Sequence, residues 1–147
     1  MIRRFGEPPH RGVTYRTRPG VYAILSRGRR VLVTHQSTPL PELQLPGGGI
    51  DPGEQPLHAL HREVFEETGW LIARPRRLGA FRRFTYMPDY GIWAEKLCAV
   101  YRAVPVRVLG EPSEPGHRAV WITPHEAAAT LGNSGDRHFV SRAWDLA

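Results

Sequence analysis

The spacing of glycine and charged residues between Gly48 and Trp70 constrains this chain more than any other feature. Five residues separate Gly48 from Glu54, and seven more separate Glu54 from a run of nine residues, Arg62 to Trp70, that reads REVFEETGW. Seven positions in this pattern hold glycine, glutamate or arginine. Since each residue type makes up only a few per cent of average sequences, a chance match is on the order of one in a million. The pattern therefore points to a specific local structure.

Residues 55–68 are predicted to form a helix. Pro56 suits the first turn, where its missing N–H is not needed, and Gly69 suits the left-handed residue just past the helix end. At about 100° per residue, one apolar stripe is expected to face the core, made of Leu57, Leu60 and Val64.

Carboxylates occupy the arc of this helix beside the apolar stripe. Glu63, Glu66 and Glu67 are spaced i, i+3 and i+4, so their side chains are neighbours and repel one another. A divalent cation among them would relieve that repulsion, since Mg²⁺ prefers carboxylate oxygens and keeps waters or phosphates as further ligands. Arg62 and Glu54 are expected to pair and brace the preceding loop against the helix.

Upstream of the helix, residues 46–49 read Pro-Gly-Gly-Gly, which lets the backbone approach a metal ion or a phosphate closely. The alternative to a metal site is an exposed acidic helix face, the ordinary setting of two adjacent glutamates. That alternative leaves the glycine-rich loop, Glu54 and Arg62 unexplained.

The whole pattern resembles the signature of the Nudix hydrolases, with Trp70 standing where the family usually has an aliphatic residue. The resemblance implies an α/β/α sandwich, in which a mixed sheet lies between helices. It also implies an enzyme that hydrolyses nucleoside diphosphate derivatives with Mg²⁺ or Mn²⁺, by attack of water on phosphorus. Glu63 and Glu67 are then the first-choice metal ligands and catalytic residues, followed as ligands by Glu66 and the Gly47 carbonyl. The predicted structural supports are Gly48, Glu54, Arg62 and Gly69.

Composition fits one globular domain over residues 1–147, since 41% of the residues are hydrophobic and no apolar run approaches the roughly 20 residues of a membrane span. The beginning of the chain lacks the apolar core of a signal peptide, and the lone Cys98 cannot form an internal disulfide, so a cytoplasmic protein is expected. The net charge of +6 would attract nucleotides. It rests almost wholly on arginine, as codon bias would produce, and no RNA-binding motif accompanies it. Nucleic acid is therefore not the expected main partner, and a homodimer is left open.

The remaining elements are predicted from pattern and turn residues. Residues 1–19 are expected to be an irregular arm with an edge strand near 13–15. A hairpin is expected from Val21–Ser26 and Arg30–His35, and a helix begins at Pro124 with Thr123 and Glu126 as a capping box. The other expected elements are a loop at 37–46, strands at 71–73, 78–86, 92–104 and 118–122, a loop at 105–116 and a last helix at 136–144.

The identity of the substrate is less constrained. Tyr86 lies sixteen residues past Trp70, near where dinucleoside polyphosphate hydrolases carry a base-stacking tyrosine, although an aromatic strand residue is more often core. Asn133 stands where MutT-type relatives carry an asparagine, although a turn role is favoured for such a residue. Three hypotheses follow: a hydrolase of nucleoside triphosphates or dinucleoside polyphosphates, a hydrolase of capped RNA ends, and a non-catalytic nucleotide-binding or regulatory module.

A glutamate outside the helix is expected to complete the site, because water attack needs a base or a further ligand facing the substrate. The candidates are Glu95, Glu111 and Glu114. Glu114 is preferred, since it lies in a loop seven residues before Trp121, a placement typical of MutT-type relatives. Glu95, within a strand, is second.

Overall fold

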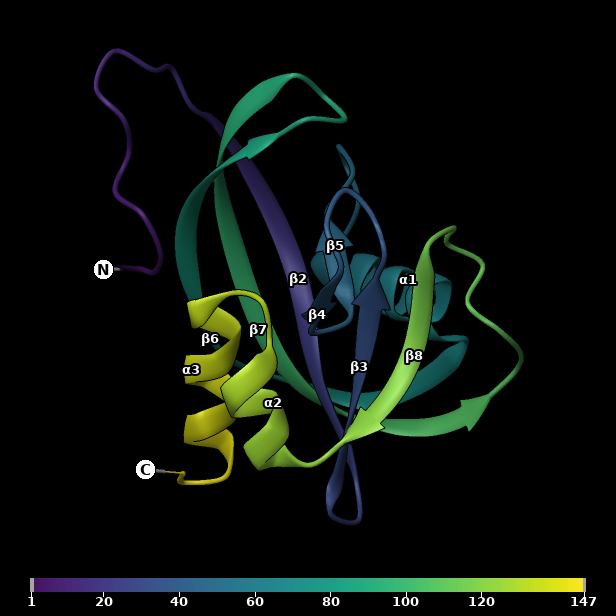
Figure 1. Cartoon of the computed structure of the whole chain (residues 1–147). Helices are drawn as coiled ribbons and strands as arrows, with labels where there is room; N and C mark the ends of the chain where they lie inside the picture. The colour runs from purple at the N-terminus through teal and green to yellow at the C-terminus, as the bar shows by residue number, and fades with distance from the viewer. Residues whose placement is uncertain (1, 147) are drawn as a thin grey trace.

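The computed structural model describes residues 2–146 and has three layers, with helices on both faces of one sheet (Figure 1). The sheet of this part of the chain has the strand order β1-β6-β7-β2-β3-β4, with β5 paired to β2 and β8 paired to β3. The expected α/β/α sandwich is therefore confirmed. The strands are β1 Arg3–Arg4, β2 Arg16–Arg27, β3 Arg30–Gln36, β4 Glu42–Gln44, β5 Gly47–Gly49, β6 Trp70–Met87, β7 Ile92–Val108 and β8 His117–Ile122; the helices are α1 Pro56–Thr68, α2 Pro124–Thr130 and α3 Ser134–Ala143.

The central strand β2 carries core residues on both of its faces. It runs parallel to β7 from Arg16 to Leu25 and antiparallel to β3 through the predicted hairpin, whose turn contains Gly28 at φ 59°. Since side chains alternate along a strand, Val21 and Ala23 face α1 while Ile24 faces α2 and α3. A strand in this position can hold only a near-continuous apolar sequence.

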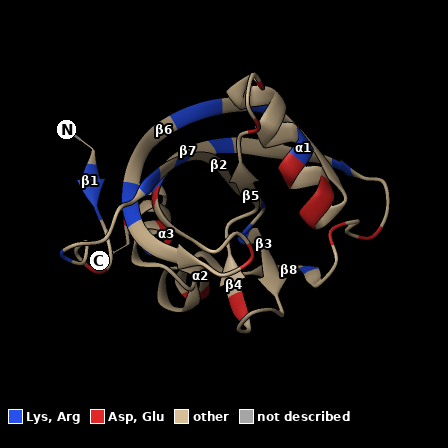
Figure 2. Cartoon of the chain, turned by 90° about the horizontal axis from the view of Figure 1, so that it is seen from above, with Lys and Arg blue, Asp and Glu red and all other residues tan. Residues whose placement is uncertain are grey.

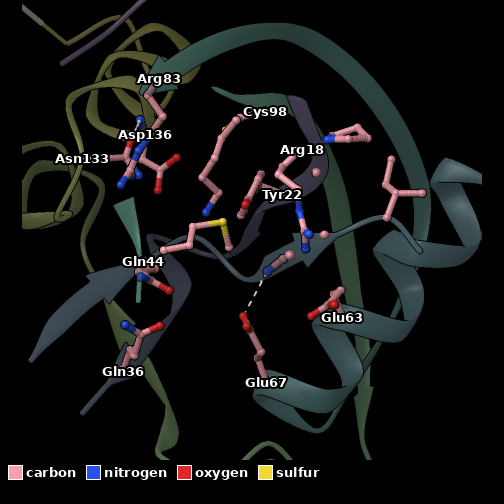
Figure 3. A pocket seen from close by; sticks show the side chains of 18 of the residues that line it. Arg18, Tyr22, Gln36, Gln44, Glu63, Glu67, Arg83, Cys98, Asn133 and Asp136 are labelled. Carbon is pink, nitrogen blue, oxygen red and sulfur yellow. Dashed lines mark hydrogen bonds between the residues drawn. The ribbon is translucent and has the colours of Figure 1, made fainter. Parts of the chain in front are cut away.

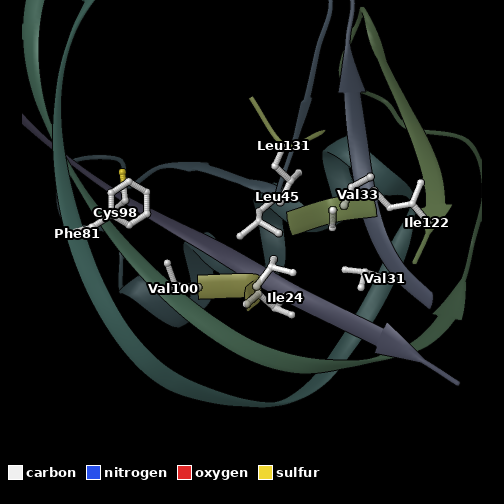
Figure 4. Packing of buried hydrophobic residues seen from close by; sticks show 11 residues of the cluster. Ile24, Val31, Val33, Leu45, Phe81, Cys98, Val100, Ile122 and Leu131 are labelled. Carbon is white, nitrogen blue, oxygen red and sulfur yellow. The ribbon is translucent and has the colours of Figure 1, made fainter. Parts of the chain in front are cut away.

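Two hydrophobic cores result, one on each face of the sheet. The core beneath α1 includes Leu60 and Val64, both fully buried, and each such side chain contributes about 1.5–3 kcal/mol. Figure 4 shows the other core, where strand residues such as Ile24 and Val100 pack with Leu131 below α2 and α3. The sheet is thus clamped from both sides, and its strands form a rigid support for the loops at its edge.

Helix α1 agrees with its prediction except at one residue of its apolar stripe. The helix begins at Pro56 and ends at Gly69, whose φ is 77° and whose N–H donates to the Phe65 carbonyl at 2.8 Å. Leu57 does not face the core, since 45% of its surface is exposed. The fully buried Ala59 joins Leu60 and Val64 in the core instead.

The last two helices also follow their capping residues. Thr123 and Glu126 form the predicted capping box of α2. Helix α3 begins two residues before the predicted Asp136, because the Asn133 side chain accepts a hydrogen bond from the Asp136 N–H at 2.8 Å and caps the helix there. None of the helices in residues 2–146 is both long and apolar enough to cross a bilayer.

Several strand predictions were wrong where pairing overrides local signals. The two strands expected at 71–73 and 78–86 are one strand, β6, which passes Arg74 and Pro75 by shifts in its register with β7. Strand β7 continues past its predicted end to Val108, and β6 rather than β7 is the longest strand. The glycine-rich turn forms β5, and the loop at 37–46 contains β4.

The N-terminal arm is also more ordered than predicted. Residues Arg3–Arg4 form β1, which lies parallel to β6 with Arg3 opposite Phe81, and Phe5 packs edge-on against the same Phe81 ring. The edge strand expected at 13–15 is absent from the described residues, and β2 starts at Arg16. Pairing with β6, which the arm's own sequence does not indicate, orders its first residues.

Gly69 is expected to tolerate alanine less well than Gly53. Both have φ near +78°, which costs alanine about 1 kcal/mol or more, but a Cβ at Gly53 meets nothing within 4 Å, whereas at Gly69 it would lie 2.0 Å from the Gly110 carbonyl oxygen. Denaturant unfolding should show that Gly69→Ala costs at least about twice as much free energy as Gly53→Ala, since overpacking adds about 1–3 kcal/mol. Equal losses would show that the 110 loop moves away freely.

Candidate active site

A cavity of about 300 Å³ opens at the edge of the sheet, between α1, β5 and the hairpin that joins β6 to β7 (Figure 3). One end is acidic and is formed by Glu63, Glu67 and Glu114 around the glycines of β5. The opposite end is lined by polar and charged residues of β4, β6, β7 and α3. Figure 2 shows acidic residues gathered on α1 and basic residues spread along β6 and β7.

Glu67 is the most deeply placed of the acidic side chains. It is 7% exposed, and its Oε1 accepts a hydrogen bond from the Gly47 N–H at 3.1 Å, drawn as a dashed line in Figure 3. Burial raises its pKa well above the usual range of a carboxyl, and the charges of Glu63 and Glu114 add to the effect. The helix therefore holds an acid here in a setting that disfavours its own negative charge.

Glu63 lies one turn earlier on the same face and contacts the glycine loop. Burial raises its pKa, against the opposing effect of Arg62. A Cβ on Gly48 would lie 2.5 Å from Glu63 Oε2, and one on Gly47 would lie 2.1 Å from the Val21 carbonyl oxygen. Glycine is required at both positions because the carboxylate and β2 occupy the space of a side chain.

Arg62 connects the loop to the helix. Its Nε and Nη2 donate to the two Glu54 oxygens at 2.7 and 2.8 Å, so the predicted pairing is present as a bidentate ion pair. Arg62 also donates to Glu63 at 2.9 Å and to the Gly49 carbonyl at 3.2 Å. The arginine holds the pKa of Glu54 well below its usual range.

Glu66, the third glutamate of the helix, is turned away from the cavity. Both of its carboxylate oxygens lie 3.4 Å from Arg62 Nη1, and it does not line the cavity wall. Its backbone carbonyl accepts a hydrogen bond from the Glu114 N–H at 2.9 Å. Glu66 thus anchors the loop that brings Glu114 to the site.

Of the three candidate glutamates outside the helix, only Glu114 lines the cavity. Glu114 lines the cavity, and its charge acts on both Glu63 and Glu67 of α1. Glu95 lies on the other face of β7 from the cavity residues Lys96 and Cys98, and its Oε2 pairs with Arg82 at 3.2 Å. Glu111 is exposed and is not part of the cavity.

His117 supports Glu67 from the side of β8. Its Nε2 lies 3.7 Å from Glu67 Oε2, and its Nδ1 shares a hydrogen bond with Thr34 Oγ1 at 2.9 Å. Burial lowers the pKa of the imidazole. His117 is the first residue of β8 and lines the cavity.

The polar end of the cavity was missed by sequence reasoning. Asp136 is 2% exposed and accepts a hydrogen bond from the Leu45 N–H at 3.4 Å; burial raises its pKa to about 6. Burial lowers the pKa of Lys96, the sole lysine of the chain. Across residues 2–146, neither Lys96 nor Arg83 has a carboxylate within 4.0 Å. Cations that face a cavity without a partner in the described chain indicate a binding site.

Tyr86 lies outside the cavity, whereas Cys98 is part of its lining. Tyr86 is 46% exposed and packs on Trp93 with a centroid distance of 5.1 Å, so it belongs neither to the core nor to the cavity wall. Tyr90, in the turn between β6 and β7, lines the cavity. Cys98 is buried, as expected, and burial raises its pKa to about 11, but it also lines the polar end.

The acidic end fits a hard divalent cation, although in residues 2–146 no three acidic, histidine or cysteine side chains converge as a preformed cage. Burial raises the pKa of both Glu63 and Glu67, and the charge of Glu63 raises that of Glu67 further, so a positive charge beside them would be favourable. Mg²⁺ is bound in proteins through one or two carboxylates, with waters and substrate phosphates completing its shell. Two glutamates beside an open glycine loop meet that requirement.

The sequence of this chain is similar to those of known hydrolases. The family model described as the NUDIX domain matches residues 16–143. An RNA pyrophosphohydrolase of Bradyrhizobium diazoefficiens is 30% identical over 140 residues, which cover 89% of this chain and 77% of that protein. A Bacillus subtilis protein named for 8-oxo-dGTP diphosphatase activity is 35% identical over 60 residues, which span 41% of this chain and only 40% of the relative.

Solved structures show the same fold. The MutT protein of Methanosarcina mazei superposes with a TM-score of 0.68 at 20% identity, covering 89% of this chain and 95% of that one. A MutT protein of Bacillus halodurans gives 0.67 at 24% identity, covering 84% and 80%.

The elevated pKa of Asp136 predicts how pH affects stability. Its folded pKa of about 6 lies above the ordinary 3.8, so folding retains a proton that the unfolded chain has lost between these values. This residue's contribution to the free energy of unfolding should therefore fall as pH rises from about 4 to 6 and stay constant above about 7. Urea unfolding of wild type and Asp136→Asn over pH 4–8 should show wild type losing stability relative to the variant in that window. Parallel curves would contradict the assignment.

Proposed function

Because the chain belongs to the Nudix hydrolase family, we propose that it hydrolyses the pyrophosphate linkage of a nucleoside diphosphate derivative in a reaction dependent on Mg²⁺ or Mn²⁺. The observation that carries the proposal is the placement of Glu63 and Glu67 beside the glycine loop, at one end of a cavity with a polar opposite end. The substrate's phosphates lie at the acidic end and its nucleoside at the polar end.

The acidic end needs a cation before it can accept a pyrophosphate, since both are anionic. A divalent ion held by Glu63 and Glu67 would neutralise phosphate charge and lower the pKa of a bound water. Arg62 keeps Glu63 in place through its 2.9 Å hydrogen bond. A Cβ at Gly49 would meet nothing within 4 Å, so this glycine leaves room for phosphate oxygens at the edge of β5. In this proposal the Gly47 carbonyl is a further ligand, whereas Glu66 is retained only as an anchor for Arg62 and the loop.

Glu114 is the proposed proton acceptor. It lines the cavity from an exposed loop that is hydrogen-bonded to the Glu66 carbonyl of α1, while Glu67 is buried and accepts a hydrogen bond from Gly47. The carboxylate of Glu114 holds the proton released by the attacking water, in the manner of a general base. His117 keeps Glu67 oriented through the contact at 3.7 Å.

The polar end suits a nucleobase. Asp136 offers acceptor oxygens, Lys96 and Arg83 offer only donors, and the amides of Asn133 and Gln44 offer both. The edge of a base likewise presents donors and acceptors side by side. A phosphate would match the cations alone and would be repelled by Asp136, so we place the base here. This arrangement supports a nucleoside triphosphate, as in MutT-type hydrolases, or a dinucleoside polyphosphate.

An RNA 5′ end is the second candidate substrate, favoured by the relative that matches 89% of this chain and is named an RNA pyrophosphohydrolase. A purely regulatory module is disfavoured, because a nucleotide sensor has no need for the complete set of glutamates with their bracing Arg62 and Glu54. A base-stacking role for Tyr86, a cytoplasmic location and a homodimer stay predictions.

Loss of the Glu67 charge should abolish most activity. Glu67→Gln is expected to lower kcat by about 10²-fold or more, while its melting temperature holds or rises because a buried acid is removed. Phosphate release from a panel of nucleoside triphosphates, followed with coupled phosphatase, measures the rate. Chelator should stop wild-type turnover, and Mg²⁺ or Mn²⁺ should restore it. Full hydrolysis in excess chelator would refute the metal dependence.

Glu114 and Glu111 provide a matched pair in one loop. Glu114→Gln should lower kcat by about tenfold or more, at the low end of a lost general base, with an unchanged melting temperature. Glu111→Gln, outside the cavity, should leave kcat unchanged. If Glu95→Gln is the crippled variant instead, the base lies on β7 and the assignment to Glu114 is wrong.

A further inference from the structure

An exposed aromatic residue and an arginine stand together at the mouth of the cavity. Tyr90 lies in the turn between β6 and β7, and Arg18 lies on β2. The Arg18 Cζ atom is 4.8 Å from the centroid of the Tyr90 ring, a cation–π contact. Both side chains line the cavity, yet Tyr90 is 61% exposed. We call these two residues the rim pair.

Packing does not explain the rim pair. The neighbouring aromatic residues of the hairpin stack on one another, with Trp93 at 5.1 Å from Tyr86 and 6.0 Å from Tyr15. Among residues 2–146, no aromatic ring stacks on Tyr90, and its ring contributes nothing to either core. An open ring beside a cation is the arrangement on which a nucleic-acid base stacks.

The rim pair is separate from the polar end of the cavity. Figure 3 shows Asn133 and Asp136 on one side and Arg18 on the other, with Tyr22 between them. A mononucleotide that places its base at Asp136 and its phosphates at Glu63 and Glu67 leaves the rim pair unused. A substrate with a second base would use all three parts.

Charge on the same strand favours a chain of nucleotides. Arg16 and Arg18 are two residues apart on β2 and therefore share one face, and Lys96 is the cross-strand partner of Arg18. This row of cations leads from the cavity to the surface, in a protein of net charge +6. A phosphodiester backbone that leaves the cavity would follow such a row.

We propose that the rim pair binds the second nucleotide of a 5′-phosphorylated RNA, with Tyr90 stacked on its base and Arg18 paired with the phosphate that joins the first two nucleotides. This proposal rests on the proposed function, because it assumes that the first nucleotide occupies the cavity. It also changes the expectation from composition that nucleic acid is not a main partner. The charge alone gave no reason for RNA; the position of Tyr90 does.

The test compares one nucleotide with a chain that begins with it. Values of kcat/KM are measured for GTP and for a 5′-triphosphorylated eight-nucleotide RNA that starts with G, using wild type, Tyr90→Ala, Tyr90→Phe and Tyr86→Ala. Tyr90→Ala should lose about tenfold on the RNA, as expected for one lost stacking contact, and less than about twofold on GTP. Tyr90→Phe should keep the RNA activity, since it keeps the ring. Tyr86→Ala, whose ring lies outside the cavity, tests the alternative stacking residue and should keep the RNA activity if the rim pair is correct.

Three outcomes would overturn the proposal. Equal losses on GTP and RNA for Tyr90→Ala would place Tyr90 in the mononucleotide site or in the fold, which melting temperatures distinguish. A loss for Tyr86→Ala instead would move the stacking site to Tyr86. A loss on a dinucleoside tetraphosphate without a loss on RNA would assign the rim pair to a second nucleoside of a small molecule.

Binding separates this proposal from the catalytic one. The anisotropy of the same RNA, labelled at its 3′ end, is measured with Glu67→Gln and with Glu67→Gln/Tyr90→Ala in Mg²⁺. About tenfold weaker binding by the double variant supports the rim pair even if wild type hydrolyses none of the substrates, which would refute only the proposed function. Equal binding by the two variants refutes the rim pair even if the enzyme is active.

Discussion

The bidentate ion pair between Arg62 and Glu54 is the interaction on which the candidate active site depends. Arg62 emerges from α1 and contacts three separate groups of the loop and helix: the Glu54 carboxylate, the Gly49 carbonyl and Glu63. The loop is therefore held at a fixed distance from the helix face, with its glycines against the carboxylates. Without this guanidinium, the glutamates of α1 would repel one another with no counter-charge inside the protein. The pair is partly exposed, so its value lies more in fixing geometry than in adding stability.

A buried acid such as Glu67 is costly, and the structure shows what offsets the cost. Leu60 and Val64, on the preceding turns of α1, are fully buried in the core below. The Gly47 N–H donates to the Glu67 carboxylate, and His117 lies on its other side. The pKa of Glu67 is still raised, because the hydrogen bond from Gly47 offsets only part of the effect of burial. A carboxyl with a strongly raised pKa is typical of functional sites, where a bound cation or substrate stabilises its negative charge.

A feature of the fold or of the site could be predicted from the sequence when the residues that determine it lie close together in the chain. Helix α1, its end at Gly69, the hairpin at Gly28 and the capping box of α2 all follow from residues within about five positions of one another, and each was predicted. The continuous strand β6 and the pairing of β1 could not be, because their hydrogen-bond partners lie far away in the sequence. The same limit applies to the site. The pairing of Arg62 with Glu54 follows from local spacing, whereas Lys96, Arg83 and Asp136 meet only through the sheet.

The cavity is therefore formed partly by residues close together in the sequence and partly by residues from separate strands and from α3. Glu63 and Glu67 at its acidic end come from one contiguous segment, and the separate loop that carries Glu114 is hydrogen-bonded to that segment at Glu66. Its other surfaces come from β2, β6, β7 and α3, where small changes of strand length move different side chains to the cavity. The β6–β7 hairpin illustrates this: with Met87 opposite Ile92, the turn places Tyr90 at the mouth and leaves Tyr86 on Trp93 outside it. A shift of the turn by a few residues would exchange their positions. Which tyrosine lines the cavity thus depends on strand register, which a distance counted along the sequence does not give.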